Sequence, residues 1–174
     1  MHWYQTIFEF IDMRSFSNLW FWIALAVMWS MASHYVLGVP FDMLQRARKH
    51  GGQAQVDLEM MVQINVARLL HIAQVSGLWI AGIVGFMLSM LVGLGFIYGI
   101  EFAQAVFCLA APMTLVGLIS LRTARIIATT ECNGETLDRR LNWHRKTVQA
   151  VGMLSLLATS MWGMWQNMQI GALG

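Results

Sequence analysis

Residues 69–100 contain no Asp, Glu, Lys or Arg, and they lie between Arg68 and Glu101. The hydrocarbon core of a bilayer is about 30 Å thick, so a helix needs about 20 apolar residues to cross it. This stretch is long enough to cross with residues to spare. It restricts the chain to folds that place a helix in a membrane, and we expect a transmembrane helix at about residues 70–97.

Small side chains recur along this expected helix and along the apolar segment after it. A stripe without bulky side chains lets another backbone approach closely, which is how helices associate in lipid. We therefore expect helix packing at both sets, with a partner in the same chain or in another. In the first segment the small residues recur every fourth position, and in the second every seventh: Ala73, Gly77, Ala81, Gly85, Ser89, Gly93; Ala103, Ala110, Gly117.

The composition supports a membrane protein with several spans. Of the 174 residues, 57% are hydrophobic and only 11% are charged, whereas soluble domains average about 25% charged residues. The mean hydropathy is +0.57. The net charge of +2 is too small to predict binding to nucleic acid. We expect the lipid bilayer to be the main environment of the chain.

The hydropathy pattern predicts an all-α, four-transmembrane-helix bundle that forms a single membrane domain over residues 1–174. The spans are expected at about 19–39, 70–97, 101–121 and 147–166. The segments 40–69 and 122–146 are expected to form helical extensions, including a short helix at Phe41–His50 that ends at Gly51 and Gly52. A short amphipathic helix at about 3–14 is expected to lie in the membrane interface.

The positions of the basic residues predict the orientation. Lys and Arg in short loops are retained on the cytoplasmic side. Ten of the eleven basic residues lie in the segments between spans one and two or between spans three and four, and only Arg14 lies elsewhere. We therefore expect a multi-pass protein of the bacterial inner membrane with both termini on the periplasmic side.

Three histidines fall at a similar depth near the inner ends of the spans: His34, His71 and His144. Two imidazoles from different helices can bind haem b, and three can bind a divalent metal. The alternative is that each histidine hydrogen-bonds to water, lipid phosphate or backbone. Because each helix carries a single such histidine, we expect no cofactor and keep haem b as the alternative.

A second candidate site is the basic cluster between spans three and four. Its members are Arg122, Arg125, Arg139, Arg140, Arg145 and Lys146. These side chains are expected either to contact anionic lipid or an acidic cytoplasmic partner, or only to set the topology. Arg122 and Arg125 lie one turn apart on one helix and are the first pair to test for a partner contact.

The residues within the spans offer little chemistry. None is charged at mid-membrane, which counts against an ion-coupled transporter, and the few polar ones are expected to hydrogen-bond between helices. The sequence contains no Walker loop, zincin helix or Gly-x-Ser-x-Gly elbow. Catalytic residues are therefore not expected, and an enzyme is the minority interpretation.

Four stretches resemble a known family. They are Glu9 to Trp20 (EFIDMRSFSNLW), Ser33-His34, Gly38 to Asp42 (GVPFD) and Glu101 to Phe107 (EFAQAVF). Together they are similar to a family of uncharacterised alphaproteobacterial inner-membrane proteins, sometimes labelled a component of the SufBCD complex, which assembles iron–sulfur clusters. The resemblance covers most of the chain and implies a cytoplasmic partner at the inner face. Because the chain offers no cluster ligands, the implied role is that of a membrane tether.

Three functions remain open from the sequence. The first is a non-enzymatic accessory or scaffold subunit that binds another membrane or cytoplasmic protein, or a second copy of itself. The second is a redox anchor that binds haem b or quinone. The third is a small channel or transporter.

Overall fold

The computed structural model describes residues 16, 19–130 and 133–171, the last three without their side chains. The described chain is all-α, as expected, apart from one short hairpin whose two strands have two residues each. Its elements are α2 (Leu19–His34), β1 (Tyr35–Val36), β2 (Val39–Pro40), α3 (Phe41–His50), α4 (Gly52–Val92), the π-helical turn η2 (Gly93–Ile97), α5 (Glu101–Thr130) and α6 (Gly134–Gly171). The interfacial helix expected at about 3–14 lies outside the described residues.

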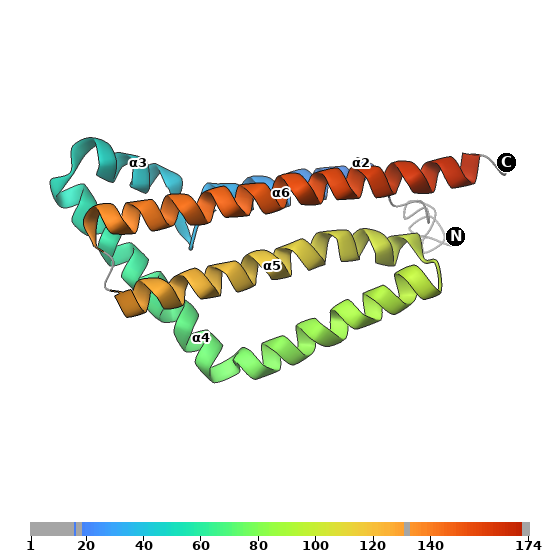
Figure 1. Cartoon of the computed structure of the whole chain (residues 1–174), viewed down its shortest axis with the longest axis horizontal. Helices are drawn as coiled ribbons and strands as arrows, with labels where there is room; N and C mark the ends of the chain where they lie inside the picture. Colours follow the sequence, from blue (N-terminus) through green and yellow to red (C-terminus); the bar gives the residue numbers. More distant parts are fainter. Residues whose placement is uncertain (1–15, 17–18, 131–132, 172–174) are drawn as a thin grey trace, which may run out of the picture.

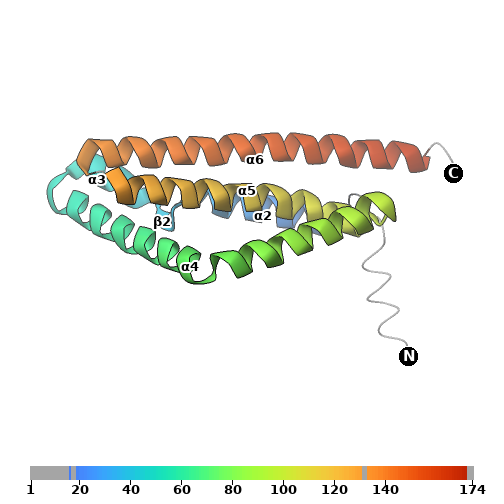
Figure 2. The ribbon, with the colours of Figure 1, turned by 60° about the horizontal axis from the view of Figure 1, so that its bottom comes forward.

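Three helices run along the long axis of the molecule, and a fourth does not follow them over its whole length. Figure 1 shows α2, α5 and α6 roughly parallel to this axis, with α3 at one end. Helix α4 leaves that end, bends, and returns toward the start of α5, as Figure 2 also shows from another side. Helices bend at Gly and Ser pairs, and Ser76 and Gly77 lie in the middle third of α4.

Helix α2 ends at His34, earlier than the apolar segment 19–39 that the sequence suggested. The next six residues form a hairpin in which Val36 pairs with Val39. Its two-residue turn consists of Leu37 and Gly38, whose φ angles are 52° and 77°. Positive φ at both positions characterises the type I′ turn, whose twist matches that of the strands. The turn therefore ends the helix although the residues remain apolar.

The helices outside the apolar segments lie where the sequence predicts them. Helix α3 occupies Phe41–His50, as expected. It ends at Gly51, whose φ of 58° suits a residue without a Cβ. Helix α4 continues without interruption from the amphipathic segment into the apolar one, and α5 extends to Thr130. The extensions expected at both segments are therefore helical.

The larger core lies at the end of the molecule that contains α3. Its buried residues come from the hairpin, α3, the first part of α4, and the facing ends of α5 and α6: Val36, Val39, Leu44, Ala47, Leu58, Val62, Val66, Ala124, Ile127, Leu137, Leu141. A second core joins α2 to α5 and α6: Phe16, Phe21, Leu25, Trp29, Ala105, Val148. The outer part of α4 contributes to neither core.

Two close approaches to α6 lie at glycines that are not part of the expected stripes. A Cβ on Gly152 of α6 would lie 2.8 Å from the Trp29 ring of α2, and one on Gly163 would lie 3.4 Å from Phe16. A Cβ on Gly77, Gly85 or Gly93 would meet nothing within 4 Å. These three glycines therefore have open space beside them in the described structure.

The small residues of α5 differ in how deeply they are buried. Ala103 is buried near the start of the helix, where α5 follows the η2 turn. Ala110 is half-buried, and a Cβ on Gly117 would meet nothing within 4 Å. Ala124, seven residues after Gly117, is again buried. The small residues of α5 are therefore covered near both ends of the helix and open at Gly117.

Two stretches of helix are long and apolar enough to cross a membrane: Gly52–Ile97 and Glu101–Thr130. Helix α2 is apolar but has only 16 residues. At 1.5 Å per residue it is about 24 Å long, less than the thickness of a hydrocarbon core. The structure thus shows a helical protein with two helices long and apolar enough to cross a membrane, where the sequence predicted four spans.

Candidate functional site

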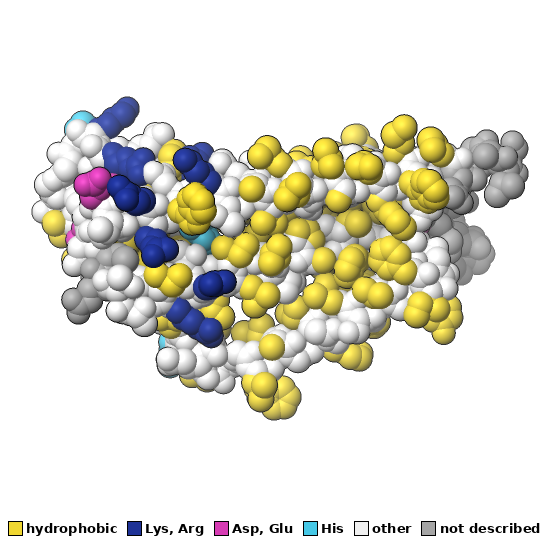
Figure 3. Space-filling model, viewed as in Figure 1, with side chains coloured by type: hydrophobic (Ala, Val, Ile, Leu, Met, Phe, Trp, Pro, Cys, Tyr) yellow, Lys and Arg dark blue, Asp and Glu magenta, His cyan; other side chains and the backbone are white. Residues whose placement is uncertain are grey.

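The basic side chains gather at one end of the molecule. Figure 3 shows Lys and Arg at the end that contains α3, while apolar side chains cover the rest of the visible face. We call this end the basic end; the Lys and Arg residues that the structure describes are Arg46, Arg48, Lys49, Arg68, Arg122, Arg125, Arg139, Arg140, Arg145 and Lys146. The two segments that we predicted from the sequence to be cytoplasmic therefore lie together at one end of the molecule.

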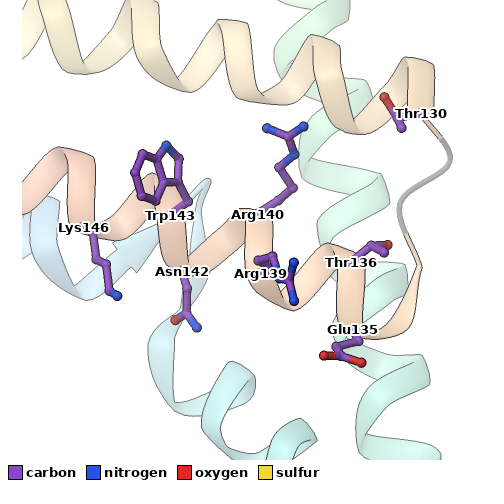
Figure 4. A pocket seen from close by; sticks show the side chains of 8 residues that line it. All are labelled: Thr130, Glu135, Thr136, Arg139, Arg140, Asn142, Trp143 and Lys146. Atoms are coloured by element: carbon purple, nitrogen blue, oxygen red, sulfur yellow. The ribbon is translucent and has the colours of Figure 1, made fainter.

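A hollow of about 730 Å³ opens beside the start of α6 at the basic end. Its lining residues are Thr130, Glu135, Thr136, Arg139, Arg140, Asn142, Trp143 and Lys146. Trp143 is 68% exposed. Figure 4 shows the side chains of Arg140 and Trp143 extending toward α5 in this close view. We call this hollow the basic groove.

The groove combines the side chains that dominate protein interfaces. Trp and Arg are enriched among interface residues whose removal costs the most binding energy. Three of the lining residues are basic and one, Glu135, is acidic, so the groove suits an acidic ligand surface. The sequence indicated Arg139, Arg140 and Lys146 but missed Trp143. A tryptophan within a charged segment was the signal that could have identified it.

The other members of the basic cluster lie elsewhere. The guanidinium of Arg145 lies 3.6 Å from the centre of the Phe41 ring. This cation–π contact joins α6 to α3 and gives Arg145 a role within the fold. Arg122 and Arg125 are exposed on α5 but do not line the groove. The structure thus divides the expected cluster into groove residues, one packing residue and an exposed pair.

Two polar contacts fix the start of α6 beneath the groove. Arg48 of α3 forms an ion pair of 3.5 Å with Asp138. The Glu59 carboxylate of α4 accepts a hydrogen bond of 2.7 Å from the backbone N–H of Gly134. A carboxylate at this position satisfies a free N–H of the helix and favours the positive end of its dipole. These contacts hold α6 against α3 and α4.

Of the three histidines, only His144 is buried. Its side chain is 3% exposed, and burial lowers its pKa below the usual 6.5. Its Nδ1 lies 3.2 Å from the Thr123 hydroxyl oxygen and its Nε2 lies 3.4 Å from that of Ser120. Each hydroxyl also lies within hydrogen-bond distance of a backbone carbonyl of its own helix. A neutral imidazole has one N–H, so only one ring nitrogen can donate to a hydroxyl oxygen.

The other two histidines are exposed. The His34 ring packs edge-on against that of Tyr35, with 5.2 Å between the ring centres. His71 is exposed on α4. Among the described residues, no three His, Cys, Asp or Glu side chains gather in a group that could hold a metal ion.

At the far end of the molecule, Gln104 joins three elements. Its amide nitrogen donates to the carbonyl of Gly95 in η2 over 2.8 Å. Its amide oxygen accepts from the indole of Trp162 over 3.0 Å and from Gln166 over 2.6 Å. Every polar atom of this amide has a partner, as a buried group requires. The sequence expectation that polar residues of the spans hydrogen-bond between helices holds for this residue.

We compared the chain with models of protein families, with curated proteins and with solved structures, and none of the three comparisons found a match.

Proposed function

We propose that this protein is a multi-pass membrane accessory subunit that binds an acidic cytoplasmic protein through the basic groove. The observation that carries the proposal is the exposed Trp143 set among Arg139, Arg140 and Lys146. An exposed tryptophan between cations gives a partner both an apolar anchor and charge complementarity. No catalytic arrangement enters this function.

The proposal includes four membrane crossings. Large apolar side chains are exposed on α2 and α6 as well as on α4 and α5, for example Ile23, Leu78, Leu118 and Leu157. A soluble protein rarely exposes so much contiguous apolar surface, whereas lipid covers it without cost. In this arrangement the basic end faces the cytoplasm and both termini face the periplasm.

The family resemblance suggests the nature of the partner. The family's label names the SufBCD complex, so a cytoplasmic assembly of this type is our first candidate for the groove. In that role the protein would tether the complex to the inner membrane.

Co-purification tests the partner. The full chain is extracted from its native membrane in mild detergent, and the co-purified proteins are identified and quantified by mass spectrometry. We expect one partner in fixed ratio, lost from the double variant Arg139→Glu, Arg140→Glu and reduced by Trp143→Ala. Lys49→Glu is the matched control, because Lys49 is exposed on α3 and does not line the groove.

Two results would contradict the proposal. A partner retained by all groove variants would show that binding occurs elsewhere. A haem Soret band in the same preparation, lost in His34→Ala or His71→Ala, would instead indicate the redox anchor that the sequence left open.

A further inference from the structure

A second cavity, of about 440 Å³, lies where the hairpin meets α4, α5 and α6. Its volume falls within the range of small-molecule sites, about 300–1,000 Å³. Its lining includes the buried His144 and residues from α2, the hairpin, α4, α5 and α6. It is separate from the basic groove, with which it shares no lining residue.

The lining changes from apolar to polar at one level on each of the three helices. On α4, Ile72 is apolar and Arg68 is charged. On α5, Val116 is followed one turn later by Ser120, and on α6 Val148 is preceded one turn earlier by His144. Because α4 and α6 run away from the basic end and α5 runs toward it, the polar member always lies nearer the basic end. The cavity is therefore amphipathic, with its polar part toward the basic end.

The polar part favours an anion or a strong hydrogen-bond acceptor. Arg68 supplies a guanidinium, which binds phosphate oxygens in pairs. Asn65 also lines the cavity, and its amide Nδ2 is buried without a hydrogen-bond partner. The structure describes all the residues that line this cavity, and none of them is acidic.

We propose that this cavity binds the phosphate-bearing head of an anionic phospholipid. The Arg68 guanidinium holds the phosphate, Asn65 lines the site beside it, and Ile72, Met113 and Val116 line the path of the acyl chains. Basic pockets between membrane helices on the cytoplasmic side are suited to such heads. The inference does not depend on the protein partner of the basic groove.

Lipid titration tests the proposal on the full chain. The protein is delipidated in detergent, and phosphatidylglycerol or phosphatidylcholine is added while bound lipid is counted by native mass spectrometry. We expect one tightly bound phosphatidylglycerol per chain and at least tenfold weaker binding of phosphatidylcholine. Glycerol phosphate and inorganic phosphate, the head without its chains, are titrated in parallel and are expected to bind at least tenfold more weakly than the lipid.

Charge reversal supplies matched variants. Arg68→Glu should weaken phosphatidylglycerol binding at least tenfold, and Asn65→Leu should weaken it less. Arg125→Glu makes the same charge change at an exposed residue of the basic end that does not line the cavity, and it should bind like the native chain. Equal losses in Arg68→Glu and Arg125→Glu would overturn the site. Binding of inorganic phosphate as tight as that of the lipid would overturn the lipid as its ligand.

Discussion

The two parts of α4 belong to one continuous helix but have opposite surroundings. Toward the basic end, Leu58, Val62 and Val66 are buried in the larger core. Beyond the bend, Leu78 is 88% exposed and Phe86 is also exposed. The first part has a polar face and an apolar face, so burial of the apolar face determines its orientation. The second part is apolar all round, so its composition favours no face over another within the chain.

The largest expected effect compares leucines in these two parts. Leu58 is 0% exposed, and Leu58→Ala should lower the free energy of unfolding by about 2–5 kcal/mol because it leaves a cavity. Leu78→Ala should change it by less than about 0.5 kcal/mol. Thermal or denaturant unfolding of both variants in the same detergent measures the difference. Equal losses would mean that the outer part of α4 also packs within the chain.

The amphipathic segments were the most predictable part of the fold. The periodicity around Leu58 and Val62 placed this segment on a helix with one buried face, and α3 follows from Pro40 and Gly51. The early end of α2 was not predictable from hydropathy, because the turn at Leu37 and Gly38 is set by backbone angles within an apolar run. Boundaries inside uniformly apolar segments have no polar residue to mark them.

The helix contacts were harder to predict than the helices. The α4 stripe indicated where a backbone can approach, but the close approach within the chain occurs at Gly152, beside Trp29. A glycine provides space, and only a complementary side chain on a facing helix determines whether that space is used. For the candidate groove, the basic residues were recognisable from charge. Trp143 could have been noticed as a tryptophan within a charged segment, but its exposure depends on the packing of α6, which the sequence does not specify.

The second largest expected effect compares Gly152, which lies against a side chain of a facing helix, with Gly85, which has open space beside it. Gly152→Leu would force side-chain atoms into the Trp29 ring and should destabilise the chain by about 1–3 kcal/mol. A Cβ on Gly85 would meet nothing within 4 Å. Gly85→Leu should therefore leave the free energy of unfolding of the isolated chain unchanged or slightly higher, because Leu favours helix more than Gly does. Unfolding of the two variants in detergent gives both values.

Gly85→Leu also tests whether the α4 stripe binds another chain. If the stripe packs against a partner helix in the membrane, Gly85→Leu should disrupt that association while Gly85→Ala, which adds little bulk, preserves it. Crosslinking in native membranes would detect the loss. Unchanged crosslinking of Gly85→Leu would leave lipid as the only neighbour of the stripe.

The smallest expected effect is a dependence of stability on pH that comes from His144 in α6. Burial lowers the pKa of His144 below 6.5, so the unfolded chain binds a proton at a higher pH than the folded chain does. The contribution of neutral His144 is therefore fully present above about pH 6.5 and is lost as pH falls through the lower folded pKa. Unfolding temperatures between pH 7.5 and 5 should decline in the native chain and decline less in His144→Gln. An identical decline in His144→Gln would assign the effect to other groups.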